Sequence, residues 1–237
     1  AARDGDTALL KDLYYQDDRR LDGAAVFVSE ALRQPDARTA SDKLALAARL
    51  LADGARETAG ELAAVKEAAA LLRAQEALGR DLAGAAGLVG LSVNETLFEL
   101  VRLGYHGRAK KIQAEFRVPE RVAWWVRLRA LVAKRDWNEI EEMGKQRKSP
   151  IGWEPFYNLV LQAGNPRLAS TFVAKCTNLE HGATVTMYEK CGMRVRAAEE
   201  AVRLRDADAW ARLLDAAGKG TPEGREIEKL GQVVFKR

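Results

Sequence analysis

Cysteine, histidine and proline are scarce in this 237-residue chain, which contains two, two and six of them. Two cysteines are too few for a disulfide framework, and we expect Cys176 and Cys191 to be free thiols in the core. With so little proline, few positions interrupt a helix. The nearest approach to a long apolar run, residues 84–91, contains three glycines and falls short of the ~18 residues of a membrane span, so we expect no direct membrane insertion.

Patterns typical of β-strands are missing as well. Valine and threonine never form the alternating runs that half-buried strands need. Alanine, leucine, arginine and glutamate, which favour helix, dominate a composition that is 47% hydrophobic and 30% charged. The sequence therefore predicts an all-α fold.

Patterns typical of catalysis are not found either. His106 and His181 stand in no HExxH or CxxC context, and no serine or cysteine has a recognisable hydrolase context. The glycines of GAAGLVG (84–90) are not spaced as GxGxxG, and AAGKGT (216–221) departs from a phosphate-binding loop at both ends. We expect no enzyme activity, no cofactor and no metal site, although a catalytic triad assembled only by folding stays open.

The first ninety residues read as helices separated by short breaks. Asp6 is a candidate N-cap for the first of them and Ser41 for the third. The last and longest run has a largely apolar face formed by Leu62, Val65, Ala69, Leu72 and Glu76. We expect these helices over residues 6–18, 24–34, 41–54 and 57–82.

The second half repeats a turn-like break at a regular spacing. Gly104, Arg135, Gly164 and Gly192 each follow one helix-like run and precede another, at spacings of 31, 29 and 28 residues. Such spacing is typical of stacked helical hairpins, which bury their apolar faces against neighbouring hairpins. We therefore predict an α-solenoid of stacked helical hairpins, divided into amino-terminal helices (1–91), hairpin repeats (92–217) and a C-terminal loop with a helix or tail (218–237).

The stretch KSPIGWEPFYNL (148–159) is rich in proline, glycine and aromatic residues. It either forms a site or turns a corner between two hairpins, and proline and glycine punctuate a chain more often than they catalyse. We expect Pro155 in the first turn of a helix, where its missing N–H is tolerated. Trp153 and Phe156 are then expected to be buried beneath the turn.

Positive charge is concentrated in residues 102–148. The whole chain has a net charge of +4, but this segment has 13 Lys or Arg against 6 Asp or Glu, a balance of +7 that leaves −3 for the rest. The helix expected after Pro119 carries two apolar strips with Arg129 between them. The broader strip contains Trp124, Trp125, Leu128, Leu131 and Val132, and the narrower one Val122, Val126 and Ala133.

This helix has two interpretations. Two apolar strips are typical of an inner solenoid helix that touches two neighbours. Alternatively, one strip faces another protein together with Arg121, Arg127 and Arg129, because tryptophan and arginine are enriched at interface hot spots. A nucleic-acid partner is disfavoured, since no RNA-binding signature is present and acidic residues interleave the basic ones.

Several of these segments resemble a known family. RAKKIQAEFRVPERVAWWVRLRAL (108–131), DWNEIEEMGKQRKSPIGWEPF (136–156) and QAGNPRLASTFVAKC (162–176) are similar to the C-terminal helical domain of vacuolar protein sorting subunit sixteen. The resemblance is strongest over residues 92–214, where the VP–WW, DW and KSPIG–PF elements follow in the same order. The first ninety residues match only in being helical.

The resemblance implies a non-enzymatic scaffold of the HOPS and CORVET membrane-tethering complexes, which act in SNARE-mediated fusion of endosomes and vacuoles. The implied partners are the SM-family (Sec/Munc-like) subunit and the other HOPS or CORVET subunits. The implied location is cytoplasmic, peripheral on the late endosome, lysosome or vacuole membrane. The implied partner-binding residues are Arg117, Arg121, Trp124, Arg127 and Arg129, together with helices before residue 92. The alternative is a helical-repeat module that binds peptides or RNA.

Overall fold

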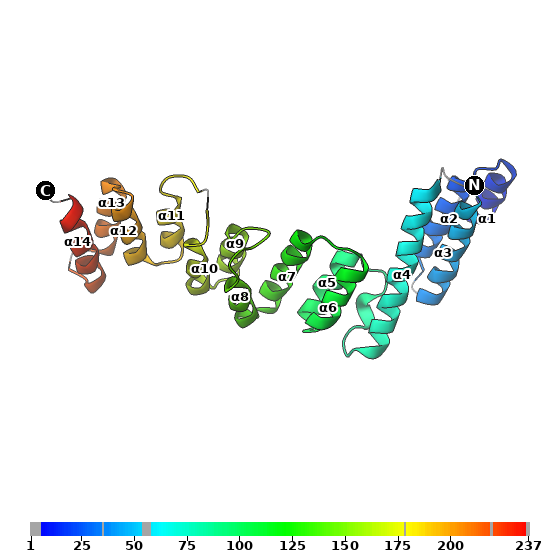
Figure 1. The fold of residues 1–237 in the computed structure, drawn as a ribbon, viewed down its shortest axis with the longest axis horizontal. Coiled ribbons are helices and arrows are strands. Elements are labelled where there is room, and N and C mark those ends of the chain that lie inside the picture. Colours follow the sequence, from blue (N-terminus) through cyan, green and yellow to red (C-terminus); the bar gives the residue numbers. More distant parts are fainter. Residues whose placement is uncertain (1–5, 35, 54–57, 178, 219, 236–237) are drawn as a thin grey trace. The chain divides into compact units, whose positions relative to one another are not determined.

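The computed structural model describes residues 6–34, 36–53, 58–177, 179–218 and 220–235, and this part of the chain contains helices but no strand (Figure 1). Contacts divide the chain into two compact units, residues 1–118 and 119–237. The predicted all-α class and the stacked hairpins are confirmed. The boundaries predicted after residues 91 and 217 stay predictions.

The described part of the first unit consists of helices that pack in chain order, followed by a helical hairpin. The helices α1 to α4 pack in chain order, α4 contacts the 3-10 helix η2, and α5 pairs with α6. Their bounds are α1 (Thr7–Gln16), α2 (Arg20–Leu32), α3 (Ala37–Ala52), α4 (Ala59–Asp81), η2 (Ala86–Leu88), α5 (Val93–Arg102) and α6 (His106–Glu115).

The second unit stacks short helices two by two. Helix α7 packs on α8 and on α9, α8 and α9 both contact α10, and α12 contacts α11, α13 and α14. Their bounds are α7 (Glu120–Lys134), α8 (Trp137–Gly144), α9 (Glu154–Gln162), α10 (Pro166–Val173), α11 (Ala183–Lys190), α12 (Arg194–Arg203), α13 (Ala207–Ala217) and α14 (Pro222–Phe235).

The four residues that mark the repeat all occupy the same position in a hairpin. Gly104, Arg135, Gly164 and Gly192 have φ of 92°, 60°, 84° and 74°, in the left-handed region. At the first, the Gly104 N–H donates to the Val101 carbonyl at 2.9 Å and the next N–H donates to the Leu100 carbonyl at 2.8 Å. This pair of bonds is the Schellman motif, which ends a helix and reverses the chain. It recurs at the other three marks, which confirms the repeat.

Turns at two further arginines use the same backbone geometry without a signal in the sequence. Arg205, between α12 and α13, has φ 57°, and Arg117, after α6, has φ 49°. Both make the same pair of backbone bonds. Arginine rarely adopts the left-handed conformation, so residue type did not reveal these turns.

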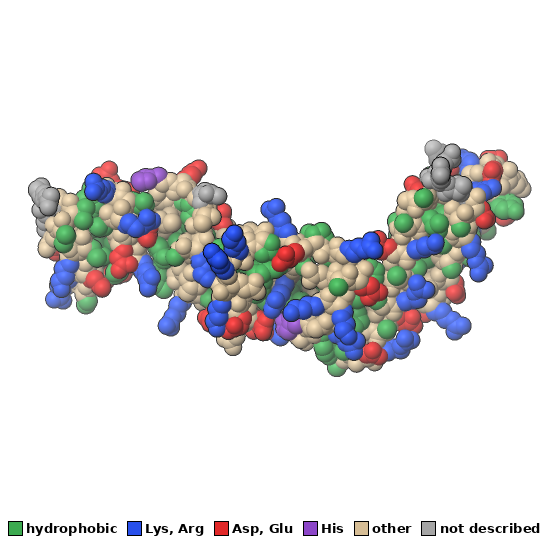
Figure 2. All heavy atoms as spheres, in the orientation of Figure 1, with side chains coloured by type: hydrophobic (Ala, Val, Ile, Leu, Met, Phe, Trp, Pro, Cys, Tyr) green, Lys and Arg blue, Asp and Glu red, His purple; other side chains and the backbone are tan. Residues whose placement is uncertain are grey.

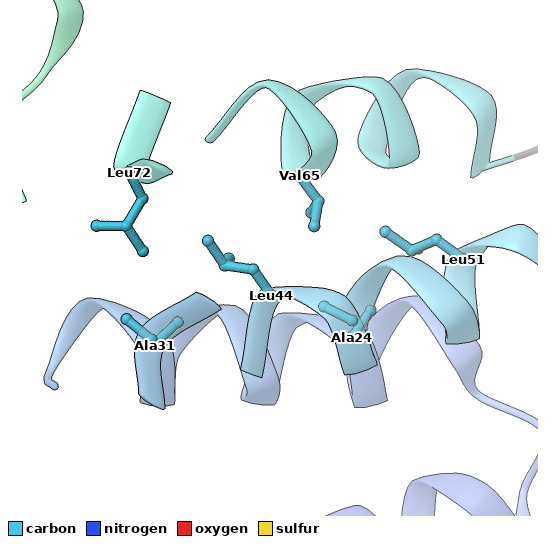
Figure 3. Packing of buried hydrophobic residues seen from close by; sticks show 8 residues of the cluster. Ala24, Ala31, Leu44, Leu51, Val65 and Leu72 are labelled. Carbon is cyan, nitrogen blue, oxygen red and sulfur yellow. The ribbon is translucent and has the colours of Figure 1, made fainter. Parts of the chain in front are cut away.

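The core of the first unit lies where α2, α3 and α4 meet (Figure 3). In Figure 3, Val65 and Leu72 of α4 point towards Leu44 and Leu51 of α3. Alanines complete the cluster, at positions 24, 31, 40 and 47. Their small side chains let long helices approach closely, and dense packing of this kind is the main source of stability in a helical layer.

Two details of the first unit correct the sequence-based expectations. Helix α3 is capped by Asp36, whose carboxylate accepts from the Thr39 N–H at 2.7 Å, and Ser41 lies inside the helix. The expected stop of that helix at Gly54 lies outside the described residues. On α4 the buried polar residue is Gln75, with 1% of its surface exposed, whereas Glu76 is half-buried and pairs with Arg80.

Gln75 ties α4 to the loop that follows it. Its amide nitrogen donates to the Leu91 carbonyl and to the Thr96 hydroxyl, each at 2.7 Å. Its amide oxygen accepts from the Gly90 N–H at 3.0 Å. A buried amide with all three bonds satisfied stabilises the structure, because each group left unpaired would carry a desolvation penalty.

The core of the second unit is aromatic and includes residues 148–159, KSPIGWEPFYNL, which we call the KSPIG stretch. Phe156 is fully buried and its ring lies 5.1 Å from Trp153 and 5.3 Å from Phe172, measured between centroids. Pro155 stands in the first turn of α9. The Lys175 ammonium lies 4.8 Å from the Trp153 ring centroid. The prediction that this stretch turns a corner with buried aromatic residues is confirmed.

Candidate protein-interaction surface

One row of α7 points to solvent and combines two arginines with a tryptophan. Arg121, Trp125 and Arg129 stand at i, i+4 and i+8, the spacing that places side chains above one another on a helix. All three are exposed, and 39% of the surface of Trp125 is open to solvent. Neither arginine forms an ion pair with another residue that the structure describes. We call these three residues the α7 ridge.

The tryptophan beside the ridge faces inward. Trp124 is half-buried, and its ring meets Phe156 edge-on at a centroid distance of 6.2 Å. The sequence placed both tryptophans in one apolar strip and named Trp124 as the contact residue. The structure separates them, because Trp124 packs against Phe156 whereas Trp125 is the more exposed ring. The signal that could have found Trp125 is its spacing of four residues from both Arg121 and Arg129.

Arg127 and Arg117 have different surroundings from the ridge. The Arg127 guanidinium donates to the Glu139 carboxylate of α8 at 2.9 Å, which joins the two helices of this hairpin. Its Nε is buried without a hydrogen-bond partner. Arg117 belongs to the first unit, where it is exposed in the turn after α6. The five residues predicted to bind a partner are therefore not one continuous row.

A groove of about 590 Å³ opens beside Trp125. The loop before α9 contributes Ile151, Gly152 and Trp153 to its lining. Side chains along α9 form one side of it, and Cys176 and Thr177, after α10, complete it. The groove lies entirely in the second unit. Sequence reasoning missed it because its lining comes from segments as far apart as Trp125 and Thr177.

The two cysteines are free and their thiols have raised pKa values. Both thiols are free, Cys191 buried and Cys176 half-buried. Burial raises the pKa of Cys176 to about 11, with a further contribution from the nearby Glu154 charge, and burial also raises the pKa of Cys191. Raised values disfavour the thiolate that a nucleophile or metal ligand needs. Within the described residues no group of three or more candidate ligands could hold a metal ion.

The described helices are also too short or too polar to cross a bilayer. Across the described parts of the chain, none combines the length and the hydropathy of a membrane span.

Comparison with known proteins gives one consistent result. The family model described as "Vps16, C-terminal region" matches residues 1–234. A probable vacuolar protein sorting-associated protein 16 homologue of Schizosaccharomyces pombe is 32% identical over 228 residues, which cover 96% of this chain and 27% of that protein. The homologue of Drosophila melanogaster is 34% identical over 119 residues, 50% of this chain and 14% of that protein.

A third relative matches a shorter segment. The vacuolar protein sorting-associated protein 16 homologue of Dictyostelium discoideum is 36% identical over 91 residues, 38% of this chain and 11% of that protein. The chain thus spans only part of the length of these relatives, and the longest match covers 27% of one of them.

Proposed function

Because this chain belongs to the Vps16 C-terminal-region family, we propose that it is a non-enzymatic scaffold segment of a HOPS- or CORVET-type membrane-tethering complex. In this role it binds the SM-family (Sec/Munc-like) subunit and brings it to the site of SNARE-mediated fusion. It works on the cytoplasmic face of the late endosome, lysosome or vacuole, held there by the other subunits of the complex rather than by insertion.

The α7 ridge carries the proposal. An exposed tryptophan between two arginines without ion pairs is the composition of an interface hot spot. A partner that supplies an apolar surface for Trp125 and carboxylates for Arg121 and Arg129 would satisfy all three side chains at once. Trp124 and Arg127 then support this surface from within, since Trp124 contacts Phe156 and Arg127 pairs with Glu139.

The proposed interface also includes the helices before residue 92 and Arg117, which the family resemblance implies. Exposed apolar side chains on α1 support a binding role for that segment, with Leu9 55% and Leu13 48% exposed. Arg117 stays in the proposal as a residue of the first unit.

A helical-repeat module that binds RNA is the alternative suggested by the basic segment 102–148. Its charge is partly neutralised by neighbouring carboxylates, in ion pairs that join Arg102 to Glu99, Arg127 to Glu139, Lys134 to Asp136 and Lys145 to Glu142. Figure 2 shows basic and acidic side chains interspersed on the visible face rather than gathered in one basic patch. A phosphate-binding surface needs unpaired positive charge.

The test is to mix the purified 237-residue chain with the SM-family subunit of the same species and measure the molar mass by size-exclusion chromatography with light scattering. We expect a stable one-to-one complex. RNA binding is measured in parallel as a function of salt, because each neutralised phosphate steepens the salt dependence. No complex with the SM-family subunit, together with tight and strongly salt-dependent RNA binding, would replace the proposal by the alternative.

A further inference from the structure

The groove beside Trp125 is held in shape by the core beneath it. Trp153, which forms part of its lining, stacks on Phe172 with an interplanar angle of 12° and a centroid distance of 6.0 Å. Gly152 before it has φ 76°, in the left-handed region where a side chain would be strained. Because the backbone turn and the ring stack both constrain this wall, the groove is preformed rather than dependent on a flexible loop.

The chemistry of the groove changes from one wall to the other. Ile151, Pro155 and Leu159 are half-buried and give it an apolar wall next to the two tryptophans. Asn158 and Gln162, along the exposed face of α9, give it a polar rim. An opening of about 590 Å³ accommodates one or two large side chains of a partner.

Positive charge surrounds the apolar wall. Arg121 and Arg129 lie one turn to either side of Trp125, and Arg147 and Lys148 immediately precede the loop that lines the groove. All four are exposed, and none forms an ion pair with another described residue. The lining itself contains one charged side chain, Glu154, at the start of α9.

From this charge distribution we infer that the groove takes an apolar anchor side chain from an acidic segment of a protein partner. The anchor enters between Trp125 and Trp153, and the carboxylates beside it bind the arginines of the α7 ridge. If the proposed function holds, this acidic segment belongs to the SM-family subunit. It extends the proposed interface from the ridge to the KSPIG stretch and α9.

Cys176 provides a built-in reporter of occupancy. It lines the groove and is half-buried, whereas Cys191 is buried and is absent from the lining. The two thiols are alkylated with N-ethylmaleimide at mildly alkaline pH, and each rate is followed by mass spectrometry of its peptide. Saturating SM-family subunit is expected to slow alkylation of Cys176 by about tenfold and to leave the Cys191 rate unchanged, because a seated anchor excludes solvent from its pocket.

A matched pair of glutamine variants tests the groove without touching the ridge. Gln162→Trp places a large ring in the groove, and Gln146→Trp places the same ring at an exposed position after α8 that is absent from the lining. With melting temperatures unchanged, we expect Gln162→Trp to weaken binding of the SM-family subunit by about tenfold. We expect Gln146→Trp to bind within a factor of two of the unmodified chain.

The outcomes separate this inference from the proposed function. If the SM-family subunit binds but Cys176 is not protected and Gln162→Trp binds normally, the groove inference is wrong and the proposed function stands. If the subunit does not bind, the proposed function fails. The chemistry of the groove is then decided by a short synthetic peptide with one leucine among aspartates. Protection of Cys176 by that peptide, but not by its leucine-to-serine version, supports the acidic-anchor chemistry, and equal rates with both overturn it.

Discussion

The two units of the molecule bury their apolar surface with different side chains. The cluster shared by α2, α3 and α4 in the first unit consists of four alanines with leucines and valine. In the second unit, the rings of Trp124, Trp153 and Phe172 meet at Phe156. Alanine lets long helices run close together, whereas large rings fill the spaces between short helices. We therefore expect removal of a single ring at Phe156 to be costly in the second unit.

The tryptophans make this difference measurable. All five of them, at positions 124, 125, 137, 153 and 210, lie in residues 119–237. Tryptophan fluorescence thus reports on the second unit, while far-UV circular dichroism reports on both.

The largest effect is expected for Phe156→Ala. It removes a fully buried ring that contacts Trp124, Trp153 and Phe172, and should lower the free energy of unfolding by about 3–5 kcal/mol. Urea denaturation followed by tryptophan fluorescence measures the change. Phe235→Ala, which removes a half-buried ring at the end of α14, is the matched control and should lose less than half as much. Equal losses would mean that the second unit has no aromatic centre.

The next largest effect is expected for Gln75→Leu, which removes the hydrogen bonds between α4 and the loop that follows it. Leucine keeps the bulk of the side chain but leaves the Gly90 N–H and the Leu91 carbonyl without this partner. The free energy of unfolding should therefore fall by about 2–3 kcal/mol. Hydrogen exchange of the Gly90 amide should accelerate in the variant. Glu76→Leu on the same helix is the control and should leave that amide protected. An unchanged exchange rate in Gln75→Leu would show that the loop is held by other contacts.

Acid should weaken the first unit through Glu30. Burial alone would raise the pKa of this carboxyl group, but the hydrogen bond from Lys11 and the ion pair with Lys43, each at 2.8 Å, outweigh it and lower the pKa from 4.5 to about 2. A lowered pKa stabilises the folded state above the unfolded value of 4.5, and this contribution is lost as the pH falls through about 2.

The measurement is urea denaturation by circular dichroism between pH 5 and pH 2 for the unmodified chain and for Glu30→Gln. The variant should lose about 1–2 kcal/mol at pH 5 and show a smaller decline on acidification. If both proteins decline in parallel, Glu30 is not the group responsible.

The smallest expected effect is a gain in stability, for Arg135→Gly. Arg135 adopts φ 60° in the hairpin turn between α7 and α8, where glycine is unstrained. Arg135→Gly should raise the stability of the second unit by about 0.5–1 kcal/mol, the relief of strain being partly offset by a more flexible unfolded chain. The mirror substitution Gly164→Ala, at φ 84° with no atom near an added Cβ, should reduce stability. A loss for Arg135→Gly would indicate that the arginine side chain stabilises the turn.

Much of the fold was predictable because its signals are local. A glycine in the left-handed conformation marks the turns at Gly104, Gly164 and Gly192, and the apolar spacing of α4 appears directly in the sequence. The turn at Arg205 was missed because its conformation is imposed by packing of α12 on α13 and not by residue type. Likewise, Asp36 and Ser41 are both acceptable caps, and only the start of α3 at Ala37 decides between them.

The candidate interaction surface was less predictable. Trp124 and Trp125 are neighbours on one helix, and which of them is covered depends on where Phe156 of α9 packs. The groove depends on the juxtaposition of α7, the KSPIG loop and the segment after α10. Helix periodicity says nothing about contacts between such distant segments. What the sequence did indicate correctly was that the KSPIG stretch turns a corner, as its buried Trp153 and Phe156 show.

The most direct test of the proposed role of the α7 ridge is a calorimetric titration of the SM-family subunit into three versions of the chain. These are the unmodified protein, the Arg121→Glu/Arg129→Glu double variant, and Arg167→Glu, which reverses an exposed charge on α10 away from the ridge. With unchanged melting, the double variant should bind about 30-fold or more weakly, since reversing a buried interface charge costs about 2–5 kcal/mol. Arg167→Glu should bind as the unmodified chain does. Binding of the double variant within a factor of two of the unmodified chain would contradict the assignment of the ridge to this partner.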